Sequence, residues 1–103
     1  MTPRTHSPVM VKEVLEYLNL KPNMNIIDAT YGSGGHAAAI LEGIRPAGRV
    51  LGIERDAALY QIAPRSERLT LKNESYADMQ ELATGAEMKE VHGVLFDFGV
   101  NLF

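Results

Sequence analysis

Cysteine is absent from the 103 residues, which excludes disulfide bonds and zinc sites built on thiolates. Long apolar runs are lacking as well: the longest are far too short to span a membrane, and residues 1–8 have no apolar core of a secretory signal. Basic residues are not in excess, because 10 Lys and Arg face 13 Asp and Glu. The net charge of −3 therefore gives no indication of a nucleic-acid surface. We expect a soluble, cytoplasmic protein and predict no metal site.

The pattern of apolar residues predicts strands that alternate with helices in one small domain. The expected strands are 24–28, 49–54, 69–73 and 91–97, and the expected helices start at Ser7 and cover 36–44, 56–62 and 77–84. Asp56 is predicted to be the N-cap of the helix that runs to Ile62. Residues 98–100 are expected to open a loop. The alternation predicts an α/β fold, a doubly wound parallel sheet with right-handed crossovers and strand order 3-2-1-4.

The segment that follows the first predicted strand is rich in glycine and reads Asp28-Ala29-Thr30-Tyr31-Gly32-Ser33-Gly34-Gly35-His36. Glycines let the backbone approach a ligand closely, and the N–H groups of the helix start favour an anionic group. In a sheet of this order, a ligand binds at the carboxyl ends of strands one and four. Those ends carry Asp28 and Asp97, so two separate parts of the sequence indicate one crevice.

Two nucleotide cofactors compete for this turn. The spacing Gly32-x-Gly34-x-x-Ala37, with Glu54 about 20 residues further on, satisfies the loose fingerprint of NAD sites. Glu54 suits either cofactor, since a carboxylate accepts both hydroxyl hydrogens of a ribose. Asp28 favours S-adenosylmethionine, because a carboxylate repels a pyrophosphate but attracts an ammonium and a sulfonium group. The NAD-binding half of an oxidoreductase stays open as the alternative.

Four blocks resemble the small-subunit ribosomal RNA (cytosine-N4)-methyltransferase H family, also called MraW. Residues 6–15 resemble H-x-P-V-L-x-x-E-V-L, residues 28–36 resemble D-x-T-x-G-x-G-G-H, residues 52–56 resemble G-x-D-x-D and residues 93–100 resemble G-x-L-x-D-L-G-V. The resemblance covers the chain from His6 to Val100. It departs from the family at Glu54, where aspartate is more usual, and at Ala37, where serine is frequent.

The resemblance implies a class I methyltransferase that uses S-adenosylmethionine to methylate a cytosine of 16S rRNA. By this resemblance Gly34, Gly35 and His36 line the methionine end of the cofactor. Glu54 takes the ribose hydroxyls, and Tyr76 contacts the adenine. Asp97 contacts the cofactor and is the candidate acceptor for the protons of the cytosine amine.

The family's chains are several times longer, so residues 1–103 are expected to be the N-terminal part of a methyltransferase domain with little activity alone. A non-catalytic remnant that only binds the cofactor is a further alternative. The strand over 91–97 would then be an apolar edge with unpaired backbone groups, which favours self-association.

Overall fold

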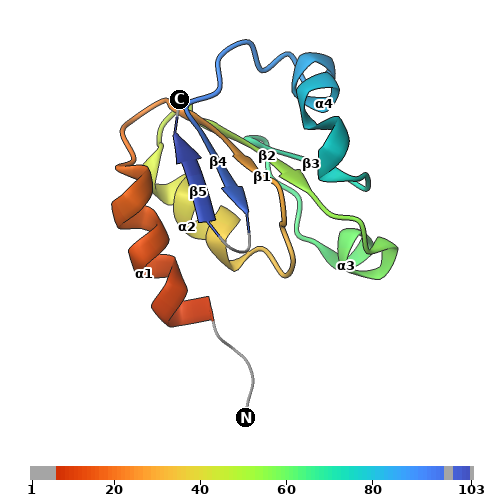
Figure 1. The fold of residues 1–103 in the computed structure, drawn as a ribbon, viewed down its shortest axis with the longest axis horizontal. Helices are drawn as coiled ribbons and strands as arrows, with labels where there is room; N and C mark the ends of the chain where they lie inside the picture. Colours follow the sequence, from red (N-terminus) through yellow and green to blue (C-terminus); the bar gives the residue numbers. More distant parts are fainter. Residues whose placement is uncertain (1–6, 97–98, 103) are drawn as a thin grey trace.

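The computed structural model describes residues 7–96 and 99–102. Figure 1 shows a twisted sheet with helices on both sides of it. The elements in chain order are α1 (Ser7–Leu18), β1 (Asn25–Asp28), α2 (Gly35–Gly43), β2 (Arg49–Ile53), α3 (Ala57–Ile62), β3 (Leu69–Lys72), the 3-10 turn η1 (Tyr76–Asp78), α4 (Met79–Gly85), β4 (Gly93–Phe96) and β5 (Gly99–Leu102). Among the described helices, none is both long and apolar enough to cross a membrane.

The five strands form one sheet in the order β3-β2-β1-β4-β5. The first four strands are parallel, and β1 lies in the centre, with Asn25 paired to Arg49 of β2 and Ile26 paired to Gly93 of β4. The predicted order 3-2-1-4 is therefore confirmed. Because β1 and β4 are neighbours, their carboxyl ends meet at one place, as the predicted crevice requires.

The segment after β4 differs from the prediction. Residues 99–102 form β5, which pairs antiparallel with β4 from Gly93↔Leu102 to Phe96↔Gly99, so the prediction of a loop over 98–100 is wrong at Gly99 and Val100. Two residues separate the strands, and a connection that short permits only an antiparallel pair. β4 is therefore not the edge of the sheet, and the self-association that we expected through it loses its physical basis.

Each face of the sheet carries its own apolar cluster, since successive strand residues point to opposite faces. On one face, Ile26, Val50, Leu71 and Leu95 pack with α1 and α2 through Val14, Leu18, Ala37 and Ile40. On the other face, Ile27, Leu51, Ile53 and Val94 pack with Ala83 and Met88 of the α4 region. The sheet is thus the middle of three layers, because both of its faces are covered by packed side chains.

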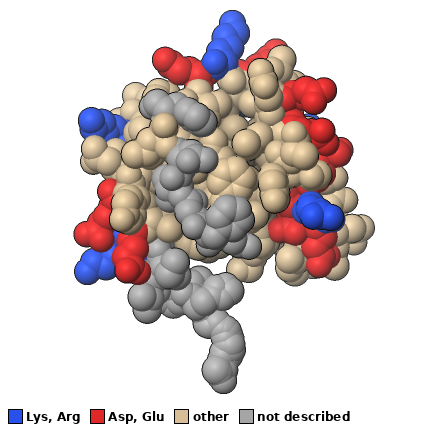
Figure 2. Space-filling model, in the orientation of Figure 1, with Lys and Arg blue, Asp and Glu red and all other residues tan. Residues whose placement is uncertain are grey.

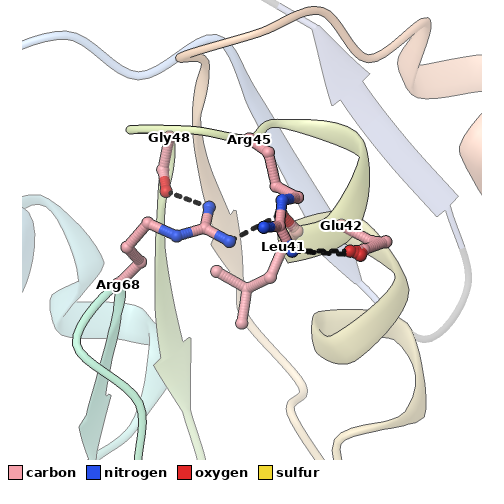
Figure 3. Close-up of polar contacts among 5 residues, drawn as sticks. All are labelled: Leu41, Glu42, Arg45, Gly48 and Arg68. Carbon is pink, nitrogen blue, oxygen red and sulfur yellow. Dashed lines mark hydrogen bonds and ion pairs between the residues drawn. The ribbon is translucent and has the colours of Figure 1, made fainter.

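We call the end where the parallel strands begin the amino edge, and the end where they finish the carboxyl edge. At the amino edge, arginine side chains donate to main-chain carbonyls. Arg68 donates from Nη1 to the carbonyl of Gly48 (2.8 Å) and from Nη2 to that of Leu41 (3.0 Å), as Figure 3 shows. Arg49 donates to the carbonyl of Ala86 at 2.6 Å. These bonds attach the loops before β2, β3 and β4 to neighbouring segments.

The starts of β1 and β4 are joined in the same region by Asn25 and His92. The Asn25 amide donates to His92 Nδ1 at 2.9 Å, and the His92 amide donates to the Asn25 carbonyl at 2.8 Å. The Asn25 side chain donates to the carbonyl of Glu90 at 2.9 Å. The amino edge is therefore closed by bonds within the chain.

Candidate functional site

The glycine turn connects β1 to α2 at the carboxyl edge. Gly32 and Gly34 have φ angles of +60° and +88°, which L side chains rarely adopt, and Gly34 is the N-cap of α2. The amide of Tyr31 donates to the carbonyl of Ile53 (3.0 Å), and the amide of Gly34 donates back to the carbonyl of Tyr31 (3.0 Å). The turn therefore follows the end of β2 closely and presents the start of α2 at the edge of the sheet.

The Tyr31 side chain packs against the glycine turn. It is buried, and a Cβ placed on Gly34 would lie 2.5 Å from its hydroxyl oxygen. A Cβ on Gly52 would lie 2.8 Å from its Cδ1, so two glycines make room for one ring. Burial raises the pKa of the Tyr31 phenol, and the charge of Asp28 raises it further, while Arg65 acts in the opposite direction.

Asp28 is the last residue of β1 and is in register with Gly52 and Leu95. We expected it at the end of strand one, where it lies, but the sequence did not reveal that only 1% of its surface is exposed. Its carboxylate therefore lies inside the carboxyl edge, close enough to Tyr31 to raise the pKa of that phenol. A direct role of Asp28 in holding the cofactor stays a prediction.

Glu54 follows β2 and joins two loops of the carboxyl edge. Its Oε1 accepts from the amide of Gly32 at 2.7 Å, and its Oε2 accepts from the amide of Asp56 at 2.8 Å. Asp56 in turn caps α3, since its Oδ1 accepts from the amides of Ala58 (2.8 Å) and Leu59 (3.3 Å). The predicted N-cap at Asp56 is confirmed, and Glu54 lies directly beside the glycine turn.

Asn73 extends this network to β3. It follows the last residue of β3, and its side-chain amide donates to the carbonyls of Glu54 (2.8 Å) and Arg55 (3.1 Å). Asn73 was not predicted from the sequence as a site residue. The available signal was its position, because it follows β3 directly, as Glu54 follows β2, and a short polar side chain there can reach loop carbonyls.

Tyr76 and Phe96 place an aromatic pair near the end of β4. Their ring centroids are 5.5 Å apart in an edge-to-face arrangement, and Tyr76 is 38% exposed. An exposed aromatic ring next to the end of a central strand can stack on a planar base. Gly35 is exposed and His36 is half-buried in the first turn of α2. Asp97 and His6, which the sequence also singled out, lie outside the described residues.

A match to a family model shows to which protein family the chain belongs. Residues 3–103 match the model described as the MraW methylase family. The chain belongs to the MraW methylase family. The resemblance found in the four sequence blocks is thereby confirmed over nearly every residue.

Curated relatives of the MraW family agree with this. The chain is 42% identical over 103 residues to a ribosomal RNA small subunit methyltransferase H of Thermotoga neapolitana, covering 95% of this chain and 34% of the relative. It is 38% identical over 105 residues to the protein of the same description in Dictyoglomus thermophilum, covering 95% of this chain and 35% of that one. The chain thus spans about a third of the length of these relatives.

Solved structures confirm the fold expected for an MraW family member. A SAM-dependent O-methyltransferase of Thermotoga maritima superposes with a TM-score of 0.66 and 21% identity over 75% of this chain and 32% of that one. A putative methyltransferase from an antibiotic biosynthesis pathway of Anabaena variabilis superposes with a TM-score of 0.55 and 22% identity, over 65% of this chain and 26% of that one. At such identities the likeness concerns the fold, which is that of class I methyltransferases.

Proposed function

We propose that this chain binds S-adenosylmethionine at the carboxyl edge and forms the N-terminal part of a methyltransferase domain. The complete enzyme would methylate the N4 amine of a cytosine in 16S rRNA, in the cytoplasm. One observation carries the proposal: in a chain of the MraW family, the structure brings the Glu54 carboxylate to 2.7 Å from the Gly32 amide of the glycine turn. Relatives described as ribosomal RNA small subunit methyltransferases support the substrate.

The residues of the carboxyl edge fit this cofactor. Gly34 takes a φ of +88° and is buried against Tyr31, whereas Gly35 beside it, in the first turn of α2, is exposed to an approaching ligand. We assign Gly34, Gly35 and His36 to the methionine end of the cofactor. Each Glu54 oxygen accepts one backbone amide and keeps acceptor capacity for a ribose hydroxyl.

The adenine end is assigned to Tyr76, whose exposed ring lies against Phe96 at the end of β4. The negative charge of Asp28 inside the carboxyl edge also supports the choice of cofactor. A carboxylate at this depth opposes the pyrophosphate of NAD, whereas it attracts the ammonium and sulfonium groups of S-adenosylmethionine. The buried position of Asp28 strengthens this effect, because charges interact more strongly away from water.

The cofactor, when bound, supplies an activated methyl group, and the chain must position the acceptor. The cytosine amine is a poor nucleophile because its lone pair is delocalised into the ring. We assign to Asp97 the task of accepting a hydrogen bond from this amine, which localises the lone pair and stabilises the positive charge that develops on nitrogen. Holding the amine in line with the methyl group supplies a further share of the rate enhancement.

The RNA part of the proposal rests on family membership rather than on surface charge. Figure 2 shows acidic side chains along both flanks of the face in view, with basic side chains standing singly among them. The net charge of the chain is −3. Such a surface attracts an RNA backbone weakly, so these 103 residues alone should transfer little or no methyl group to small ribosomal subunits.

Calorimetric titration tests the cofactor assignment. We expect the chain to bind S-adenosylmethionine and its product S-adenosylhomocysteine, and not to bind NAD. Binding of NAD without binding of either methyl-donor compound would contradict the proposal and favour an oxidoreductase half. Binding of the methyl donor by a chain that stays inactive when joined to the remaining two thirds of a relative would indicate a non-catalytic remnant.

A further inference from the structure

The Glu54 carboxylate accepts hydrogen bonds from two backbone amides that lie far apart in the sequence. Gly32 lies 22 residues before it and Asp56 two residues after it, and the two bonds measure 2.7 and 2.8 Å. We propose that Glu54 is a positioning residue that fixes the glycine turn in its ligand-ready conformation before any cofactor arrives. This role goes beyond accepting ribose hydroxyls. Its effect on cofactor affinity rests on the proposed function, whereas the fixing of the turn in the ligand-free chain does not.

The strength of the two bonds supports this role. Both are short and charge-assisted, and such bonds are roughly twice as strong as those between neutral groups. The contact with Gly32 is partly buried, so water competes less for the carboxylate. Since Gly32 has a φ of +60° and no side chain, its conformation depends on what its backbone contacts. The carboxylate therefore restricts the most mobile type of residue at the point where the ligand binds.

The length of the side chain decides which amides can be reached. Removing one methylene shortens the reach by about 1.5 Å. An aspartate at position 54 can still accept from the amide two residues on, which is the usual Asx turn, and so keeps the contact with Asp56. It would lose the contact with Gly32 on the neighbouring loop. Glu54→Asp therefore keeps the negative charge but separates the two loops.

The rest of the turn has anchors that do not involve Glu54. The Tyr31 amide bonds the carbonyl of Ile53, and the Gly34 amide bonds the carbonyl of Tyr31, each at 3.0 Å. The Tyr31 ring is buried against Gly52. The fold should therefore survive Glu54→Asp, and the change should be confined to the Gly32 region.

Amide hydrogen exchange, followed by NMR on the ligand-free chain, tests the structural part. In Glu54→Asp we expect the Gly32 amide to exchange about tenfold faster or more, with the Asp56 amide close to wild type. Glu54→Gln keeps the length, but its NH2 group cannot accept, so at least one of the two amides should exchange faster. Glu16→Gln, which removes a charge from an exposed position on α1, is the matched control and should change neither amide. Wild-type exchange at Gly32 in both Glu54 variants would overturn the proposal.

Titration with S-adenosylhomocysteine tests the ligand-binding consequence. If Glu54 prepares the turn, Glu54→Asp should weaken the affinity by about three- to tenfold, because the ligand must then order the turn itself. Wild-type affinity in Glu54→Asp would overturn this consequence. A wild-type chain that binds no S-adenosylhomocysteine would refute the proposed function, while the exchange at Gly32 still decides the structural role of Glu54.

Discussion

At the amino edge, the positively charged side chains of Arg68 and Arg49 donate to loop carbonyls; at the carboxyl edge, the negatively charged side chain of Glu54 accepts from loop amides. Both edges are thus held by charged side chains bound to backbone groups, but with opposite polarity. The loop carbonyls of Gly48 and Ala86 are satisfied within the chain at the amino edge. The carboxyl edge combines a helix start, two left-handed glycines and a carboxylate with spare acceptor capacity.

The difference indicates a division of labour along the strands. An arginine side chain that donates to a loop carbonyl stabilises the fold, and it does not contribute to binding a ligand. A carboxylate that positions a turn and can still accept hydroxyl hydrogens does both. We therefore expect substitutions that remove arginine donors at the amino edge to lower stability without changing ligand affinity, and substitutions that displace the glycine turn at the carboxyl edge to lower both.

Gly34→Ala should have the largest effect. It places a Cβ 2.5 Å from the Tyr31 hydroxyl, in a residue with a φ of +88°, so the turn must move. We expect a loss of about 2–4 kcal/mol in the free energy of unfolding, from the strained φ and the overpacking, together with loss of S-adenosylhomocysteine binding. Urea denaturation and calorimetric titration measure the two effects.

Gly85→Ala is the matched control for this substitution, because a Cβ at Gly85 meets nothing within 4 Å. It should leave affinity unchanged and stability equal or slightly higher, since alanine favours a helix. Wild-type affinity in a folded Gly34→Ala variant would contradict the assigned difference between the two edges, because the glycine turn at the carboxyl edge would then not contact the ligand.

Arg68→Met should have the next largest effect, and on stability alone. It leaves the carbonyls of Gly48 and Leu41 without their donor in a partly buried place (Figure 3). We expect a loss of about 1–3 kcal/mol in the free energy of unfolding and an unchanged affinity of the folded chain for S-adenosylhomocysteine. A clear change in that affinity would show that the amino edge also shapes the ligand site.

Arg45→Met provides the control for Arg68→Met. Arg45 pairs with Glu42 at 3.0 Å, and both side chains are more than 60% exposed. Exposed pairs of this kind contribute little, so the loss should stay below about 0.5 kcal/mol. Equal losses in the two variants would mean that the carbonyl bonds of Arg68 do not stabilise the amino edge.

Tyr31→Phe should have the smallest effect, which is confined to alkaline pH. Because burial and Asp28 raise the pKa of Tyr31 in the folded chain, the unfolded chain loses this proton first as the pH rises. The stability contributed by the neutral phenol is therefore complete below pH about 10 and is lost as the pH rises through the folded pKa. The fall in unfolding free energy between pH 9 and 11 should be shallower in Tyr31→Phe, as measured by urea denaturation. Tyr17→Phe, at an exposed site on α1, should keep the wild-type slope.

Much of the fold could be predicted from the sequence because its signals are local. The cap at Asp56 needs only the amides of the next three residues, and the glycine turn needs a particular residue type at particular positions. The order of the parallel strands followed from general rules for alternating strands and helices. Each of these signals lies within one element or its connection.

The remaining features depend on contacts between distant segments. β5 forms because β4 offers backbone groups to it, and the sequence of residues 99–102 does not reveal this pairing. The double contact of Glu54 needs the Gly32 amide, which the sequence places 22 residues away. Asp28 has the residue type expected at a ligand site, but the sequence does not reveal that the sheet buries it. Site residues were thus predicted by type, whereas their partners were not.

The central position of β1 has a consequence for the rate and order of folding. β1 pairs with β2, which follows after a single helix, and with β4, whose first contact with it joins Asn25 to His92 across 67 residues. Closing the longer loop costs more chain entropy, so we expect the β1–β2 pair to form before β4 docks. The carboxyl ends of β1 and β4 come together only in this last step, so the cofactor proposed to bind there would select chains that have finished folding.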